Sequence, residues 1–85
     1  MDREQLYQRA LEPKTGDKFV WKGHSAIGTV INAKNGKGMI EFQIENYGVM
    51  QDFPEYFTPE SWRERIENSL IRRDDIEFIP VEMEV

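Results

Sequence analysis

Cysteine is absent from this 85-residue sequence, and histidine occurs only once. Without cysteine there is no disulfide framework and no thiolate metal site, so a domain of this size must be held together by packing. The same absence favours the cytosol. The first residues include Asp2, Arg3, Glu4 and Arg9, which an apolar signal core would not contain, and no apolar run approaches the length of a membrane span. We expect a cytoplasmic protein that makes no use of the membrane.

Residues suited to catalysis or metal binding are scarce as well. His24 adjoins Ser25, but nothing marks the third group that would orient a base toward a nucleophilic serine. The acidic stretches Asp74–Asp75 and Glu82–Glu84 lack the spacing of a calcium loop and the histidines of a zinc site. We therefore expect no catalytic residue, no metal and no cofactor.

The composition indicates one small globular domain over residues 1–85. Apolar residues make up 39% of the chain, which includes two Trp, three Tyr and five Phe. A chain this short buries about 60 to 65% of its surface on folding, which leaves room for a single core.

The start of the chain predicts a helical segment over residues 1–12. Leu6, Tyr7, Ala10 and Leu11 fall on one side of such a helix. Pro13 ends it, because the residue before a proline is pushed out of helical geometry. A helix of this length is marginal in water and needs the core to hold it.

A second helix is predicted over residues 58–73. Thr58 suits the N-cap, and Pro59 suits the first helical position, where the missing amide hydrogen is not needed. Trp62, Ile66 and Leu70 recur every four residues and form a narrow apolar stripe that would pack on the core.

An antiparallel sheet is predicted over residues 16–57. The run 18–23 carries Phe19 and Trp21 at alternate positions, which suits a strand with one buried face. Asn35-Gly36 supplies the positive φ angles that a two-residue type I′ turn requires, and so predicts a hairpin. With Lys34 opposite Lys37, this turn would place six residues on one face as the pairs Ile27–Ile44, Thr29–Phe42 and Ile31–Ile40.

The remaining strands complete an α+β fold. Residues 47–53 predict a fourth strand after a turn at Asn46–Gly48, with Val49, Gln51 and Phe53 on one face. Residues 76–85 predict a last edge strand with a break near Pro80. The whole is a small curled antiparallel sheet of four to five strands with one packed helix and a short N-terminal helix.

Charge is segregated along the chain. Residues 13–38 contain all five lysines and one acid, a balance of +4, whereas residues 39–85 contain twelve acids and four arginines, a balance of −8. Such segregation indicates surfaces of opposite sign. The hairpin, however, pairs the lysine-bearing strand with one that carries Glu41 and Glu45, so the two signs can also neutralise each other.

The acidic part favours a noncatalytic protein–protein interaction module. Acidic surfaces speed and orient association with basic partners, and a protein that handles nucleic acid is a natural target for such an inhibitor or regulator. The candidate contact residues are four acids and two tyrosines: Glu41, Glu45, Tyr47, Asp52, Glu55 and Tyr56. We expect a monomer or a weak dimer.

Direct nucleic-acid binding is the alternative. Lysines would contact phosphates and a tryptophan would stack on a base, although the sequence pI of about 4.8 opposes this. The residues in question are Lys14, Lys18, Trp21, Lys22, Lys34 and Lys37. The two hypotheses differ in whether these lysines share one face.

The stretch "GDKFVWKGHSAIGTV" followed by a hairpin resembles the opening of small SH3-like barrels of the KOW and Tudor type, over Gly16 to Phe57. The resemblance implies an SH3-like partial barrel. It also implies a binding role, since such modules bind peptides, nucleic acid or partner proteins. A helix over 58–73 departs from these barrels, which often have only a short turn there, and no residue set matches the aromatic cage of a methyl-lysine reader.

Overall fold

The computed structural model describes residues 2–83. In chain order its elements are α1 (Arg3–Leu11), β1 (Lys18–Trp21), β2 (Ala26–Asn32), β3 (Ile40–Asn46), β4 (Val49–Met50), β5 (Glu55–Phe57), α2 (Pro59–Ile66), the π-helical η1 (Glu67–Arg72), β6 (Ile76–Ile79) and the 3-10 turn η2 (Val81–Met83).

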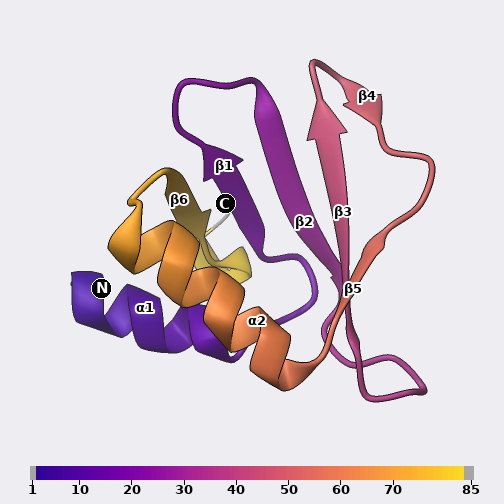
Figure 1. Ribbon diagram of the computed structural model, residues 1–85, viewed down its shortest axis with the longest axis horizontal. Helices are drawn as coiled ribbons and strands as arrows, with labels where there is room; N and C mark the ends of the chain where they lie inside the picture. Colours follow the sequence, from indigo (N-terminus) through magenta and orange to yellow (C-terminus); the bar gives the residue numbers. More distant parts are fainter. Residues whose placement is uncertain (1, 84–85) are drawn as a thin grey trace.

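The six strands form one antiparallel sheet in the order β4–β3–β2–β1–β6, and β5 also pairs with β3 (Figure 1). The path begins at β4 and ends at β6, so the sheet is open. The predicted α+β class, with a curled antiparallel sheet and two helices, is confirmed. The strands are shorter and more numerous than predicted, and β1 already ends at Trp21.

Both helices lie on the same face of the sheet (Figure 1). α2 begins at Pro59 with Thr58 as its N-cap, as predicted, and α1 begins at Arg3, within the segment predicted over 1–12. The Asp2 carboxylate accepts a hydrogen bond from the Gln5 amide at 2.8 Å, and the Gln5 side chain accepts one from the Asp2 amide, which makes a capping box. Thr58 Oγ1 accepts from the Ser61 amide at 3.1 Å, with Pro59 in the first turn.

The core lies between the sheet and the helices and is rich in aromatic rings. Phe19, Phe42 and Trp62 meet edge to face, with ring centroids 5.5 to 5.8 Å apart. Such contacts add about 0.5–1.5 kcal/mol beyond the area they bury. Trp62 Nε1 also donates a hydrogen bond of 2.9 Å to the Ala10 carbonyl, which fastens α2 to α1.

The predicted register between β2 and β3 is wrong by one residue. Val30 pairs with Phe42, and Gly28 pairs with Ile44, so the even-numbered residues of β2 face the core. Ile27 and Ile31 face outward and are 38% and 42% exposed.

The register follows from packing and from the connection between the strands. The ring of Phe42 lies where a Cβ on residue 28 would stand, so only glycine fits beneath it. The expected two-residue turn is instead a connection over 33–39. There Asn35 Oδ1 accepts hydrogen bonds from the Lys37 and Met39 amides at 2.8 and 3.0 Å, and the positive φ belongs to Gly38.

The predicted strand over 47–53 is confirmed only at Val49–Met50. β4 contains only Val49–Met50, and pairing with β3 resumes at Glu55. A turn with two positive φ angles does occur, but at Tyr47 (φ 50°) and Gly48 (φ 80°), where Asn46 pairs with Val49. This is the type I′ signature in the place where the sequence predicted only a turn.

The last strand also ends early. β6 stops at Ile79, and the break predicted near Pro80 is confirmed. Residues 81–83 form the 3-10 turn η2, so the predicted strand over 76–85 is wrong there. The rest of that prediction, Glu84 and Val85, lies outside the described residues.

The helix predicted over 58–73 changes type in its second half. Over residues 67–72 the helix is π-helical: each backbone amide bonds to the carbonyl five positions before it, as the Arg73 amide does to the Asn68 carbonyl at 2.9 Å. Ser69 is buried in this segment, and Leu70 packs half-buried against the core, as the stripe of Trp62, Ile66 and Leu70 predicted.

Candidate protein-binding surface

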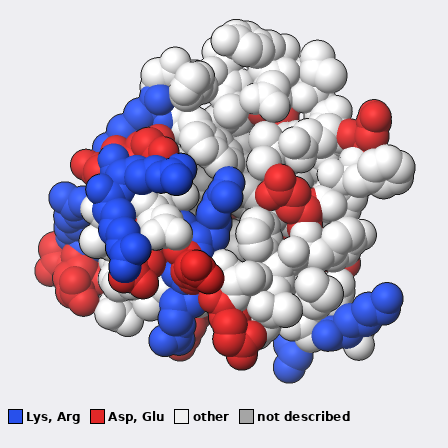
Figure 2. All heavy atoms as spheres, viewed as in Figure 1, with Lys and Arg blue, Asp and Glu red and all other residues white. Residues whose placement is uncertain are grey.

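The edge of the sheet at β4 exposes large apolar side chains. Tyr47 is 80% exposed, Val49 70%, Met50 63% and Phe53 81%, all within one short stretch of chain. Single exposed apolar residues are normal, but a concentration of this kind marks an interaction site. We call these four residues the apolar edge. Figure 2 shows that the charged side chains gather over the helices, whereas the surface over the upper ends of β2, β3 and β4 is largely uncharged.

The turn that carries Tyr47 is strained and firmly held. A positive φ is unusual for a bulky residue, because its Cβ approaches the following carbonyl. The Tyr47 amide donates a hydrogen bond of 3.0 Å to the carbonyl of Ser25, which fixes the turn against the connection between β1 and β2. A strained residue with an exposed side chain is a reason to look for function at that position.

Two of the predicted acids lie on the outer face of β3, one beside β4 and the other beside β5. Glu45 pairs with Met50 of β4, and Glu41 pairs with Tyr56 of β5. Glu41 also accepts a hydrogen bond of 3.1 Å from Asn35 Nδ2. The acids therefore alternate with apolar and aromatic side chains across three neighbouring strands.

The other two predicted acids lie elsewhere on the same border. Glu55 pairs with Phe42 and so belongs to the inner face, while Asp52 lies in the exposed stretch between β4 and β5. The six predicted protein-binding residues thus share one border of the sheet, but they are divided between its two faces.

These acids have no cation partner within residues 2–83. The ion pairs of that part of the chain all lie on other elements: Arg3–Asp74, Arg9–Asp17, Arg9–Glu82, Lys14–Glu82, Lys22–Asp74 and Arg72–Glu67. Of the four, Glu45 and Asp52 lie beside the apolar edge, whereas Glu41 and Glu55 lie where β5 pairs with β3.

The lysines of the nucleic-acid alternative lie in two regions. Lys14, Lys18 and Lys22 lie along and beside β1, and Lys34 and Lys37 lie in the connection before β3. The first group is engaged: Lys14 contacts Glu82 at 3.4 Å, Lys22 contacts Asp74 at 3.1 Å, and Lys18 is not without a partner either.

A hollow of about 330 Å³ adjoins the apolar edge on the inner face of the sheet. Trp21, Tyr47 and Arg65 are among the residues that line it. The half-buried Trp21 thus faces this hollow rather than the lysines beside it on β1. The Arg65 guanidinium has no hydrogen bond or ion pair among the described residues.

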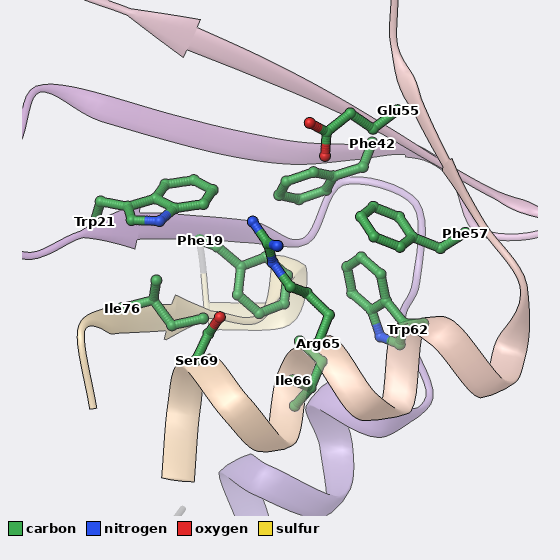
Figure 3. A pocket seen from close by; sticks show the side chains of 10 residues that line it. All are labelled: Phe19, Trp21, Phe42, Glu55, Phe57, Trp62, Arg65, Ile66, Ser69 and Ile76. Atoms are coloured by element: carbon green, nitrogen blue, oxygen red, sulfur yellow. The ribbon is translucent and has the colours of Figure 1, made fainter. Parts of the chain in front are cut away.

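Deeper between sheet and helix, the hollow gives way to a narrow crevice. Its walls are aromatic, and Arg65 reaches from α2 toward Phe42 and Glu55 at its mouth (Figure 3). The volume is only about 20 Å³, which is enough for one water molecule. The crevice is therefore a packing gap and leaves no room for a larger ligand.

The groups with shifted pKa values lie away from the apolar edge. A hydrogen bond from Arg9 lowers the pKa of Glu82 from 4.5 to about 2. Burial alone would lower the pKa of Arg9, but its hydrogen bonds to Asp17 and Glu82 outweigh that effect and raise it. The hydrogen bond from Lys22 lowers the pKa of Asp74. These shifts report ion pairs between elements of the fold.

Over residues 2–83, no group of three or more His, Asp or Glu side chains is placed to hold a metal ion, and His24 is exposed. In the same part of the chain, every helix is too short or too polar to cross a membrane.

No protein-family model, no curated protein and no solved structure matches this chain. The resemblance to KOW and Tudor modules therefore stays a prediction. The function has to be argued from the geometry of the surface.

Sequence reasoning named Tyr47 but missed Val49, Met50 and Phe53 as surface residues. It assigned them to a regular strand, because their alternation with polar residues suits one. The available signal was the pair Gly48 and Pro54, which bracket the stretch, since a proline limits strand pairing.

Proposed function

We propose that this protein is a noncatalytic binding module that docks on a basic protein through the apolar edge and the acids around it. One observation carries the proposal: four exposed apolar side chains lie beside Glu45 and Asp52, two acids that have no cation partner within residues 2–83.

The arrangement matches the anatomy of a protein interface. Aromatic anchors such as Tyr47 and Phe53 suit the desolvated centre, where a few residues carry most of the binding energy. Glu45 and Asp52 suit a polar rim, where charges raise the association rate and select a partner of opposite sign. A partner whose basic surface also binds nucleic acid would have that surface covered, so the module would act as its inhibitor or regulator.

The test compares two charge reversals of equal size. Glu45→Lys with Asp52→Lys changes the border of the apolar edge, whereas Glu60→Lys with Glu64→Lys changes two exposed acids of α2 by the same net charge. Each immobilised variant is incubated with an extract of the source cells, and the captured proteins are identified by mass spectrometry.

We expect the edge variant to lose a basic protein that the wild type and the α2 variant both retain. A further variant, Phe53→Ser, should lose the same protein without any change of charge. Thermal unfolding of each variant checks that it is folded. Equal capture by all four proteins would contradict the proposal.

A further inference from the structure

The opposite edge of the sheet, at β6, has backbone groups that no other described strand pairs with. Within residues 2–83, β6 pairs with β1 alone. The Lys22 amide donates a hydrogen bond of 2.9 Å to the Asp75 carbonyl, which sets the phase of this ladder. Antiparallel pairs alternate between those that exchange hydrogen bonds and those that do not. Val20 and Glu77 are therefore a pair that exchanges backbone hydrogen bonds. The backbone amides and carbonyls of Ile76 and Phe78 point away from β1.

An apolar hollow of about 620 Å³ runs beside these groups. Its walls come from three other elements: Leu6 of α1, Leu70 of η1 and Met83 of η2. At one end the Asp74 carboxylate holds Lys22 at 3.1 Å and Arg3 at 3.7 Å, so the cations there are already engaged. The free backbone of β6 thus has a hollow next to it that could take apolar side chains.

Glu77 gives this edge its charge. It is exposed on the outer face of β6, between Ile76 and Phe78, and has no ion pair among the described residues. A strand added here would place one of its own side chains directly opposite Glu77.

We propose that the β6 edge takes up an extended segment of a partner protein as an added antiparallel strand. Two segment residues opposite Ile76 and Phe78 would exchange backbone hydrogen bonds with them and turn apolar side chains toward the hollow. The residue between them is a lysine or arginine that pairs with Glu77. The recognised segment is therefore apolar–basic–apolar.

A second copy of this chain is a poorer occupant. In the register centred on β6, Glu77 would lie opposite Glu77 of the copy, and like charges directly opposite are destabilising. Pro80 offers no amide hydrogen, so it limits a shift of the register toward the end of the strand. The β6 site is separate from the apolar edge, and Glu77 belongs to neither of the charge reversals described above.

The probe is the blocked peptide acetyl-Thr-Val-Lys-Val-Thr-amide, and the control is the same peptide with Glu in place of Lys. Each is titrated into ¹⁵N-labelled protein and into the variant Glu77→Lys, which alters an exposed side chain. We expect the amide signals of Ile76 and Phe78 to shift and their hydrogen exchange to slow. The wild type should prefer the Lys peptide by up to about fivefold, and Glu77→Lys should prefer the Glu peptide.

Methylation of both valine nitrogens of the peptide should abolish binding, because the methyl groups remove the donors that the added strand needs. Absence of binding at millimolar peptide would overturn the proposal. Binding that leaves the Ile76 and Phe78 amides unchanged, or an unaltered preference in Glu77→Lys, would do the same. Protection of the same two amides by self-association, seen by sedimentation without peptide, would assign the edge to a second copy instead.

Discussion

Arg9 and Asp17 are joined by two hydrogen bonds, from Nη1 to Oδ2 at 2.8 Å and from Nη2 to Oδ1 at 2.7 Å. The Asp17 side chain is fully buried, and its oxygens also accept from the amides of Lys14 and Val81 at 2.8 and 3.0 Å. A buried carboxylate is tolerated when it is paired and hydrogen-bonded in this way.

Replacing Asp17 by Asn should destabilise the fold by about 3 kcal/mol, because Arg9 loses its buried partner and an amide nitrogen faces existing donors. This loss of stability lies at the low end for a buried ion pair, because Arg9 still has Glu82 as an ion-pair partner. Urea unfolding measures the change, and the exposed Asp52→Asn is the control. A loss below about 1 kcal/mol would show that the pair contributes little.

Acid should weaken the fold partly through Glu82. Its folded pKa of about 2 lies below the unfolded value of 4.5, so its contribution is present above pH 4.5 and is lost as the pH falls through about 2. Glu82→Gln should therefore lose less stability than the wild type between about pH 5 and about pH 2. Urea midpoints over this range test it, with Glu64→Gln as the control, and parallel curves for all three proteins would contradict it.

Gly28→Ala should cost about 1–3 kcal/mol, because the added methyl group overlaps the ring of Phe42. Gly36→Ala is the matched control, since nothing lies near its Cβ and its φ is not positive. Thermal unfolding compares the two. Combining Gly28→Ala with Phe42→Leu should recover part of the loss, and equal effects of the two alanines would refute this account of the register.

Tyr47→Asn should raise stability by about 1 kcal/mol while it weakens docking on the partner. Asparagine followed by Gly48 is a preferred type I′ pair, so the substitution relieves the positive φ and removes an exposed ring. Tyr56→Asn, which relieves no positive φ, is the control. If Tyr47→Asn lowers the melting temperature, the turn is not strained in the way described.

Single-stranded DNA and RNA should bind weakly or not at all, because Lys14 and Lys22 already pair with acids. Fluorescence anisotropy with labelled oligonucleotides at low and near-physiological salt tests this. Binding that weakens steeply with salt, and is lost on Lys34→Glu with Lys37→Glu, would favour the nucleic-acid alternative over the protein-binding one.

The features that the sequence predicts correctly have local causes. Thr58-Pro59 starts a helix through groups only a few residues apart, and Pro80 ends a strand because it has no amide hydrogen. Such signals need no knowledge of the rest of the fold.

The register of β2 against β3 cannot be predicted without knowledge of the rest of the fold. Ile27 and Ile31 are more apolar than Gly28, so the sequence pattern favours the wrong face. The outcome depends on Phe42, which needs a residue without a side chain beneath its ring, and on the longer connection around Asn35. Neither contact can be seen in an apolar pattern.

The candidate site was only half predictable for a similar reason. Charge can be counted along a sequence, so acids such as Glu45 and Asp52 were identified. Whether these acids are neutralised depends on which cations the fold brings near them. Arg3, Arg9 and Lys22 form their ion pairs with Asp74 and Glu82 instead. The exposure of Phe53 depends on β4 ending after two residues, which no local signal except Pro54 indicates.

Asp17 accepts from residues that belong to opposite ends of the described chain. Arg9 is in α1, whereas the Val81 amide comes just after β6. Glu82, the next residue, forms an ion pair with the same Arg9. Detaching either terminal segment would leave the same carboxylate buried without enough partners. The two ends should therefore open in one cooperative step, with matching rates of hydrogen exchange, even though more than seventy positions separate Arg9 from Glu82 along the chain.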